Sequence, residues 1–387
     1  MADLSDQNQD PEHDDAETDE GFDGHSDSDL DSALGSNVAD STYSLSSSIF
    51  EYRTLHGRTY HSDRGTAQYW ASNDDQASQS LDIAHHFTLL LLEDKLHLAP
   101  LKPDIQRVLD IGTGTAIWAI DFADEHPHVE VVGTEISPIQ PTWMPSNLQL
   151  ASNDEQQNES MDIVDFADQF PGAKVVGTDI SPIQPSWVPP NLEFHIDDCT
   201  QPWTFAPDSI DFVHMRYLFG SIKDWSALFK EAFRTCRPGG WVESHEASAM
   251  MESDDGTVTD TSAMHEWGRF FIEGGKKMGQ PCTIIEDDLQ QKCMREAGFE
   301  DIQVADYKIA IGGWPKDKKM REIGQYVLAA LEQDFEGYVL YMASQLLGWS
   351  MQEVKVYCAQ LRRELRSTAN HPFFRYRAVY GRKLQTS

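Results

Sequence analysis

Residues 107–116 read RVLDIGTGTA, and this stretch decides the fold. The apolar run over 107–111 is typical of a buried strand, and Gly112 and Gly114 permit a tight turn before an apolar helical pattern starts at Ile117. A helix that starts directly after such a turn presents free N–H groups to a bound ligand. The stretch therefore predicts an α/β fold with a nucleotide-type ligand at the carboxyl end of its first strand.

Acidic residues at the ends of successive strands distinguish two cofactor classes. Nicotinamide-binding loops usually read GxGxxG, and the third glycine position here holds Ile117. Asp110, directly before the loop, instead suits S-adenosylmethionine, whose amino-acid end carries an ammonium group. Glu135 closes a second apolar strand, where a carboxylate can accept both ribose hydroxyls, and Asp197 and Asp198 end a third, near the adenine amino group. Each acid alone is more typical of a turn or a helix cap, but their shared placement favours S-adenosylmethionine.

Further stretches form a recognisable set with the glycine loop: VLDIGTGTAIWAIDFADEHP, VVGTDISPIQPSWVPPNLEFHIDD, SIKDW, CRPGGWVE, EAGFEDI and GGWPKDKKM. From about Ser44 to the C-terminus, the chain resembles the fungal LaeA-like methyltransferases associated with secondary metabolism. The resemblance implies a class I methyltransferase fold, Rossmann-like, with a seven-stranded, mostly parallel sheet flanked by helices, a helical N-terminal cap and C-terminal helices. Ala116 departs from the family, which usually has a third glycine there; we expect weaker cofactor binding at most.

The chain also repeats part of itself. Residues 121–148 recur at 165–192, and residues 71–83 recur at 151–163. The second copy omits residues 84–119, which hold the glycine loop. With two copies, one of them truncated, this is a partial duplication or two joined coding segments rather than a repeat array.

The duplication leaves one cofactor cradle and two candidates for the ribose carboxylate, Glu135 and Asp179. Glu135 follows the glycine loop and its helix at the ordinary spacing. Asp179 instead precedes, at the ordinary spacing, the strand that ends at Asp197. We favour Glu135, and expect the surplus segment, 151–191, to be peripheral. Because each doubling of a loop costs only about 0.6 kcal/mol, the insert need not unfold the domain.

A fourth strand is predicted at Ser209 to Met215, followed by a loop. In parallel sheets ligands lie beyond the carboxyl ends of the strands, so the candidates to border the methyl group are His214, Met215, Arg216 and Tyr217. For His214, a core position is nearly as good an interpretation. No residue stands out as an obligatory base, and the catalytic residue stays unassigned. The predicted cofactor-binding residues are Asp110, Gly112, Thr113, Gly114, Glu135, Asp179, Asp197, Asp198, His214 and Arg216.

Later segments predict a short strand at Trp241 to Glu243 after a turn at 237–240, a helical lid within 254–277, and strands near 302–307 and 308–311. The tail shows three amphipathic helical patterns, over 320–331, 335–347 and 352–365. The predicted organisation is a disordered acidic tail over 1–43, an N-terminal cap over 44–103, a cofactor-binding domain over 104–313 with the insert at 151–191, and a C-terminal helical extension over 314–387.

Composition narrows the function further. The net charge of −34, with no basic residue before Arg53, opposes direct nucleic-acid binding and predicts a solvated leader. We expect no membrane span, reduced cysteines and no metal site, because the five cysteines lack CxxC spacing and the His85-His86 pair has no third ligand in view. Cytoplasmic or nuclear residence follows as an expectation.

Two functions remain. The first is an S-adenosylmethionine-dependent methyltransferase linked to fungal secondary metabolism, acting on a small-molecule or protein acceptor that the sequence does not identify. The second is a catalytically impaired regulatory or scaffold protein of the same fold, with protein partners in a regulatory complex. A nicotinamide oxidoreductase is a distant third because the third glycine is missing.

Overall fold

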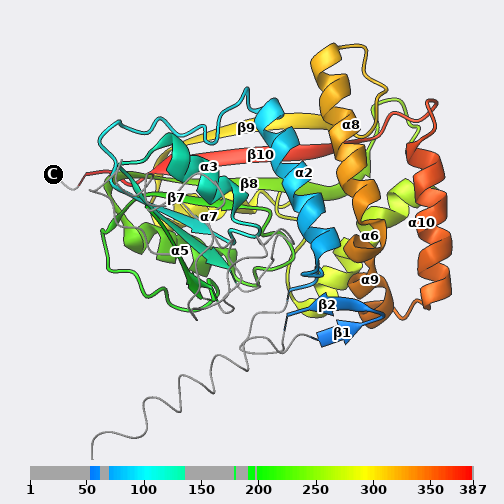
Figure 1. The fold of residues 1–387 in the computed structure, drawn as a ribbon, viewed down its shortest axis with the longest axis horizontal. Coiled ribbons are helices and arrows are strands. Elements are labelled where there is room, and N and C mark those ends of the chain that lie inside the picture. The colour runs from blue at the N-terminus through cyan, green and yellow to red at the C-terminus, as the bar shows by residue number, and fades with distance from the viewer. Residues whose placement is uncertain (1–52, 62–68, 136–177, 180–190, 197, 386–387) are drawn as a thin grey trace, which may run out of the picture. The chain divides into compact units, whose positions relative to one another are not determined.

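The structure, a computed structural model, describes residues 53–61, 69–135, 178–179, 191–196 and 198–385 (Figure 1). The predicted tail over 1–43 lies outside these residues, as does the insert except for 178–179 and Asn191. A small hairpin, β1 (Arg53–Leu55) and β2 (Arg58–Tyr60), precedes the main fold.

The described residues contain a sheet of eight strands in the order β5-β6-β4-β3-β7-β8-β10-β9. Only β10 pairs antiparallel with its neighbours, so the sheet is mostly parallel, as predicted. Seven of these eight strands, all but β5, match the expected class I methyltransferase sheet. The strands are β3 (Arg107–Ile111), β4 (Glu130–Glu135), β5 (Thr178–Asp179), β6 (Leu192–Ile196), β7 (Ile210–Arg216), β8 (Cys236–Glu252), β9 (Glu300–Ala310) and β10 (Phe373–Arg382).

The eighth strand, β5, comes from the second copy of the repeat. The first copy forms β4, which pairs with β3 along its whole length, as the sequence predicts. In the amino-terminal parts of the two strands, β4 pairs directly with β6, from Val131 opposite Leu192 to Gly133 opposite Phe194. Nearer the carboxyl edge, the two residues of β5 pair with the end of β4 on one side and with β6 on the other. The second copy therefore adds a short strand between β4 and β6 and leaves β3 with its first-copy neighbour. The expectation that the whole surplus segment is peripheral is thus wrong at residues 178–179.

Helices cover both faces of the sheet. On one face, α5 and α7 pack on residues of β3, β7 and β8 such as Leu109, Val213 and Val242. On the other, α3 packs Trp118 and Phe122 against the strands around Val108, Val131 and Phe212. The helices are α2 (Asp75–Leu91), α3 (Ile117–Glu125), α5 (Trp225–Thr235), α6 (Ala263–Met278), α7 (Leu289–Ala297), α8 (Lys318–Gln333), α9 (Phe335–Leu340), the π-helix η1 (Tyr341–Leu346) and α10 (Met351–Leu365).

A third cluster joins the N-terminal cap to the C-terminal helices. Its buried side chains come from α2, α6, α8, α9, α10 and the far ends of β8, β9 and β10. Figure 1 shows α2 and α8 lying side by side, and the two helices pack against each other. Segments about 240 residues apart in the sequence thus form one core, which closes one side of the sheet's carboxyl edge.

Three local predictions differ from the structure. The turn predicted at 237–240 and the strand at Trp241–Glu243 belong to one long bulged strand, β8, in which Gly239 has a φ of +89° and donates its N–H to Lys383 O. The strands predicted near 302–307 and 308–311 are a single strand, β9. The tail is not helical to its end: it closes with β10, which lies between β8 and β9, so the sheet crosses the boundary predicted at residue 314.

None of the helices in the described ranges is long and apolar enough to cross a membrane. The five cysteines form no disulfide. Burial raises the pKa of the Cys236, Cys282 and Cys358 thiols to about 12, so these side chains are unreactive core residues.

Ala116 gives a stability prediction. It is the N-cap of α3 with a φ of +67°, a left-handed conformation that glycine adopts without strain. Ala116→Gly should raise the free energy of unfolding by about 0.5–1 kcal/mol, because relief of the strain outweighs the added freedom of the unfolded chain. Urea denaturation measures the change. Ala119→Gly, inside the same helix and fully buried, is the matched control and should destabilise by about 1 kcal/mol or more. Equal destabilisation by both changes would contradict the prediction.

Candidate active site

A cavity with about 850 Å³ of empty space, partly open to solvent, lies at the carboxyl ends of β3, β4 and β7, and we call it the glycine-loop cavity. Five of the predicted cofactor-binding residues line it: Gly112, Thr113, Gly114, Asp198 and Arg216. Residues from three separate segments therefore meet there, as the strand-end pattern of the sequence predicts.

Asp110 and His214 lie behind this cavity and do not line it. They are opposite each other in the β3–β7 register, both are buried, and their Oδ1 and Nδ1 atoms are 2.7 Å apart. Trp118 of α3 stacks on the His214 ring at 3.7 Å between centroids. The other oxygen of Asp110, Oδ2, accepts a hydrogen bond from Thr113 Oγ1 at 2.7 Å. Asp110 therefore holds the Thr113 side chain of the loop from behind the cavity.

Burial dominates the electrostatics of this pair. It raises the pKa of Asp110 to about 7 and lowers that of His214 well below its usual range. At neutral pH the imidazole is therefore uncharged, and the pair carries no more than one negative charge. Such a pair orients the loop without placing a full ion pair in the core.

The remaining acids end neighbouring strands. Glu135 and Asp179 are directly opposite each other in the β4–β5 register, so both ribose candidates reach the same part of the sheet edge. Asp197 lies outside the described residues. Asp198 lines the glycine-loop cavity, and its Oδ1 also accepts hydrogen bonds from Thr200 N at 2.9 Å and Thr200 Oγ1 at 2.6 Å. Asp198 thus shapes a turn as well as the cavity wall.

Arg216 and Tyr217 border the opening. Arg216 Nη1 lies 3.1 Å from His85 Nδ1, and His85 Nε2 lies 2.8 Å from Asp121 Oδ2, which ties the cap helix α2 to α3. Neither His85 nor His86 lines a cavity described here. Tyr217 has a φ of +57°, a strained conformation for an aromatic residue, and such strain persists where the surrounding structure holds it.

Glu246 of β8 holds this strained loop, and sequence reasoning missed it. Its two carboxylate oxygens accept the backbone N–H groups of Leu218 at 3.0 Å and Phe219 at 3.1 Å. Burial raises its pKa to about 8 even though both N–H groups favour the charged form. The signal in the sequence was a pair of acids, Glu243 and Glu246, in the middle of the segment that forms β8, where both side chains are buried.

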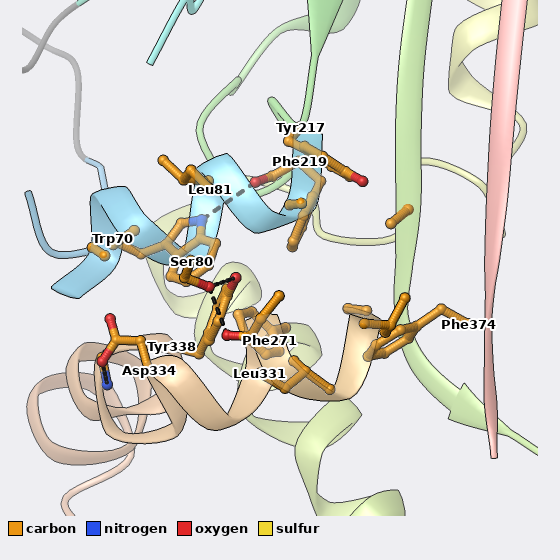
Figure 2. Close-up of a pocket in the computed structure, with 18 of the residues that line it drawn as sticks. Trp70, Ser80, Leu81, Tyr217, Phe219, Phe271, Leu331, Asp334, Tyr338 and Phe374 are labelled. Carbon is orange, nitrogen blue, oxygen red and sulfur yellow. Dashed lines mark hydrogen bonds between the residues drawn. The ribbon is translucent and has the colours of Figure 1, made fainter. Parts of the chain in front are cut away.

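A second cavity, which we call the aromatic cavity, has about 990 Å³ of empty space, partly open to solvent. Figure 2 shows Tyr217 and Phe219 at one end and Asp334 at the other. Trp267 and Phe271, from the segment predicted as a lid, form part of its wall. Tyr69, Leu81 and Tyr217 line both cavities, so the two spaces adjoin at these residues.

The glycine-loop cavity fits S-adenosylmethionine. Gly112 and Gly114 have φ values of +68° and +57°, and a Cβ at Gly112 would lie 2.4 Å from Leu218 Cδ2. The turn therefore needs glycine at both positions for its left-handed backbone, and at Gly112 also for its close contact with Leu218. The N-terminus of α3 receives no side-chain cap hydrogen bond, which leaves its first N–H groups to a ligand carboxylate.

The chain is similar to several known proteins. A family model described as a methyltransferase domain matches residues 162–304. The chain is 33% identical to methyltransferase pytC of Aspergillus terreus over 341 residues, covering 88% of this chain and 90% of that protein. It is 28% identical to secondary metabolism regulator LAE1 of Cochliobolus heterostrophus, covering 82% and 90%. Among solved structures, a phosphoethanolamine N-methyltransferase of Haemonchus contortus with S-adenosylhomocysteine is similar at 18% identity and a TM-score of 0.40, covering 79% of this chain and 52% of that one.

Proposed function

Because this chain belongs to the family of fungal S-adenosylmethionine-dependent methyltransferases of secondary metabolism, we propose that the glycine-loop cavity holds its cofactor. The observation that carries the proposal is the meeting of the left-handed Gly112–Gly114 loop, the uncapped N-terminus of α3 and the end of β4 in one cavity. Calorimetric titration with S-adenosylmethionine tests it, with NAD as the control ligand. Binding of NAD alone would overturn it.

Different residues would hold different parts of the cofactor. The backbone of the loop and the first turn of α3 would receive the carboxylate of the amino-acid end. Glu135 would accept the ribose hydroxyls, with Asp197 or Asp198 near the adenine amino group. Asp110, which the sequence predicts as a partner of the ammonium group, would act through Thr113 as a positioning residue, because its carboxylate contacts Thr113 and His214.

Methyl transfer requires chiefly that the protein orient the two reactants and exclude water. When bound, S-adenosylmethionine supplies an electrophilic methyl group on a sulfonium. Tyr217, held by Glu246 through the two residues that follow it, stands where the two cavities adjoin. Among the described residues, Tyr69, Leu81 and Tyr217 line both cavities, and none of them carries a carboxylate or an imidazole. We propose that catalysis rests chiefly on proximity and desolvation, and the catalytic residue stays unassigned.

The choice between the two ribose candidates gives a second prediction. Glu135→Ala should weaken S-adenosylmethionine binding about 10- to 100-fold, because hydrogen bonds to a charged group contribute about 1.5–3 kcal/mol. Asp179→Ala should leave the affinity nearly unchanged, since β4, not β5, adjoins β3. Calorimetry on both variants decides between them. A loss confined to Asp179→Ala would show that the second copy carries the function.

The scaffold alternative and the location stay proposals as well. A chain that binds S-adenosylmethionine but methylates nothing in a fungal extract would favour a regulatory role with protein partners. We retain cytoplasmic or nuclear residence from the sequence, and imaging of a fluorescent fusion checks it.

A further inference from the structure

We propose that the aromatic cavity binds the methyl acceptor, and that this acceptor is a neutral, largely apolar small molecule with its reactive hydroxyl or amine at the Tyr217 end. The inference rests on the proposed function, because it takes the cofactor to be in the adjoining glycine-loop cavity.

The walls of the aromatic cavity favour a flat apolar ligand. Trp70 and Phe271 meet edge to face at 5.0 Å between ring centroids, and Phe219 lies 5.8 Å from Trp70. All three rings line the cavity, together with aliphatic side chains from α8 such as Leu331. Trp70 Nε1 donates to Phe219 O at 3.3 Å, which fixes the indole against the loop that follows β7. Aromatic ligands pack well against such preformed walls.

The polar groups of the wall already have partners within the protein. Ser80 Oγ donates to Ala330 O at 2.7 Å and lies 2.8 Å from Tyr338 Oη, as the dashed lines in Figure 2 mark. Asp334, the one charged side chain among the described lining residues, is held by Arg58 through bonds of 2.6 and 2.8 Å. A charged acceptor would thus be desolvated without a counter-charge, which disfavours it strongly.

The same walls disfavour a peptide acceptor. Backbone N–H and C=O groups need partners when they leave water, and this cavity offers them rings and methyl groups instead. An acceptor with a single polar atom avoids that cost if the atom lies at Tyr217, where the cavities adjoin. There a lone pair of the acceptor oxygen or nitrogen forms the new bond to the methyl carbon. The carbon–sulfur bond breaks, its electron pair stays on sulfur to give the thioether, and the acceptor's proton leaves to water.

A matched pair of probes tests the ligand class. We expect 1-naphthol, neutral with one hydroxyl, to bind the full-length chain in the presence of S-adenosylhomocysteine at least 10-fold more tightly than 1-naphthoic acid, an anion at pH 7. Calorimetry gives both affinities. Equal or stronger binding of the anion, or no binding of 1-naphthol, would overturn the proposed ligand class.

A filled-cavity variant tests the place. Ala330 of α8 is buried and lines the aromatic cavity, whereas Ala359 of α10 is exposed. Ala330→Trp should lower 1-naphthol affinity at least 10-fold and keep S-adenosylmethionine affinity within 3-fold, and Ala359→Trp should change neither. If Ala330→Trp does not fold, the smaller change Ala249→Leu, in the same wall, decides. Unaltered 1-naphthol binding in a folded filled-cavity variant contradicts the placement. Failure of the wild type to bind S-adenosylmethionine would instead refute the cofactor site.

Discussion

Replacing Gly112 with valine is expected to weaken S-adenosylmethionine binding by about 100-fold or more. Two effects combine. The φ of +68° is strained for a β-branched residue, and the new Cβ would lie 2.4 Å from Leu218 Cδ2 in the cavity wall. Relief of either effect moves the loop or Leu218, and both line the space that the cofactor needs. Calorimetric titration of the purified variant measures the loss.

The control for this variant separates backbone strain from cofactor contact. Gly256 also has a left-handed φ, +75°, but it lies in an exposed turn with nothing near its missing Cβ. Gly256→Val should therefore destabilise the fold to a similar degree through strain while S-adenosylmethionine affinity stays unchanged. If Gly112→Val binds as tightly as the control, the cofactor does not approach this loop.

Removal of Asp334 should produce the largest loss of stability, about 3–5 kcal/mol. Arg58 of β2 donates to both oxygens of Asp334 and also to Asp74 and Ser72 beside the start of α2. Asp334 is in turn the N-cap of α9, where it accepts the Gly337 N–H at 3.0 Å. Asp334→Ala leaves a buried guanidinium with half its partners and an uncapped helix. Urea denaturation at pH 7 gives the free energy of unfolding.

Two further variants make this result interpretable. Asp334→Asn keeps an acceptor for the Gly337 N–H but lacks the charge, so it should lose less stability than the alanine variant. Asp254 forms an ion pair with Lys308 in which both side chains are mostly exposed, and Asp254→Ala should cost less than about 1 kcal/mol. An effect of Asp334→Ala no larger than that of Asp254→Ala would show that Arg58 does not join these segments.

The start of the fold was predictable because its signals are local. The strand, the loop and helix α3 follow one another within 107–125, and each is specified by residues close in sequence. The neighbour of β3 was predictable as well, because a short crossover from α3 leads into the first copy of the repeat. Strand β10 was not predicted, although FFRYRAVYGR is rich in aromatic residues, because it follows three helical patterns and its apolar residues do not alternate strictly with polar ones.

The details of the site depended on pairings that are not local. Asp110 and His214 fall opposite each other in adjacent strands, so their side chains share a face and bond to each other instead of lining the cavity. Register between strands a hundred residues apart leaves no mark on either segment alone. The aromatic cavity is a stronger case, because Trp70, Phe219, Phe271 and Leu331 come from four separate segments that meet only in the folded chain.

The wall that Tyr69, Leu81 and Tyr217 share has a thermodynamic consequence. With one ligand on each side, any shift that the first imposes on these side chains changes the affinity for the second. Linkage requires this effect to be mutual: by whatever factor an acceptor alters cofactor affinity, the cofactor alters acceptor affinity by the same factor. The fraction of the protein that has both ligands bound then depends on the concentrations of both. A low concentration of one ligand changes the apparent affinity for the other.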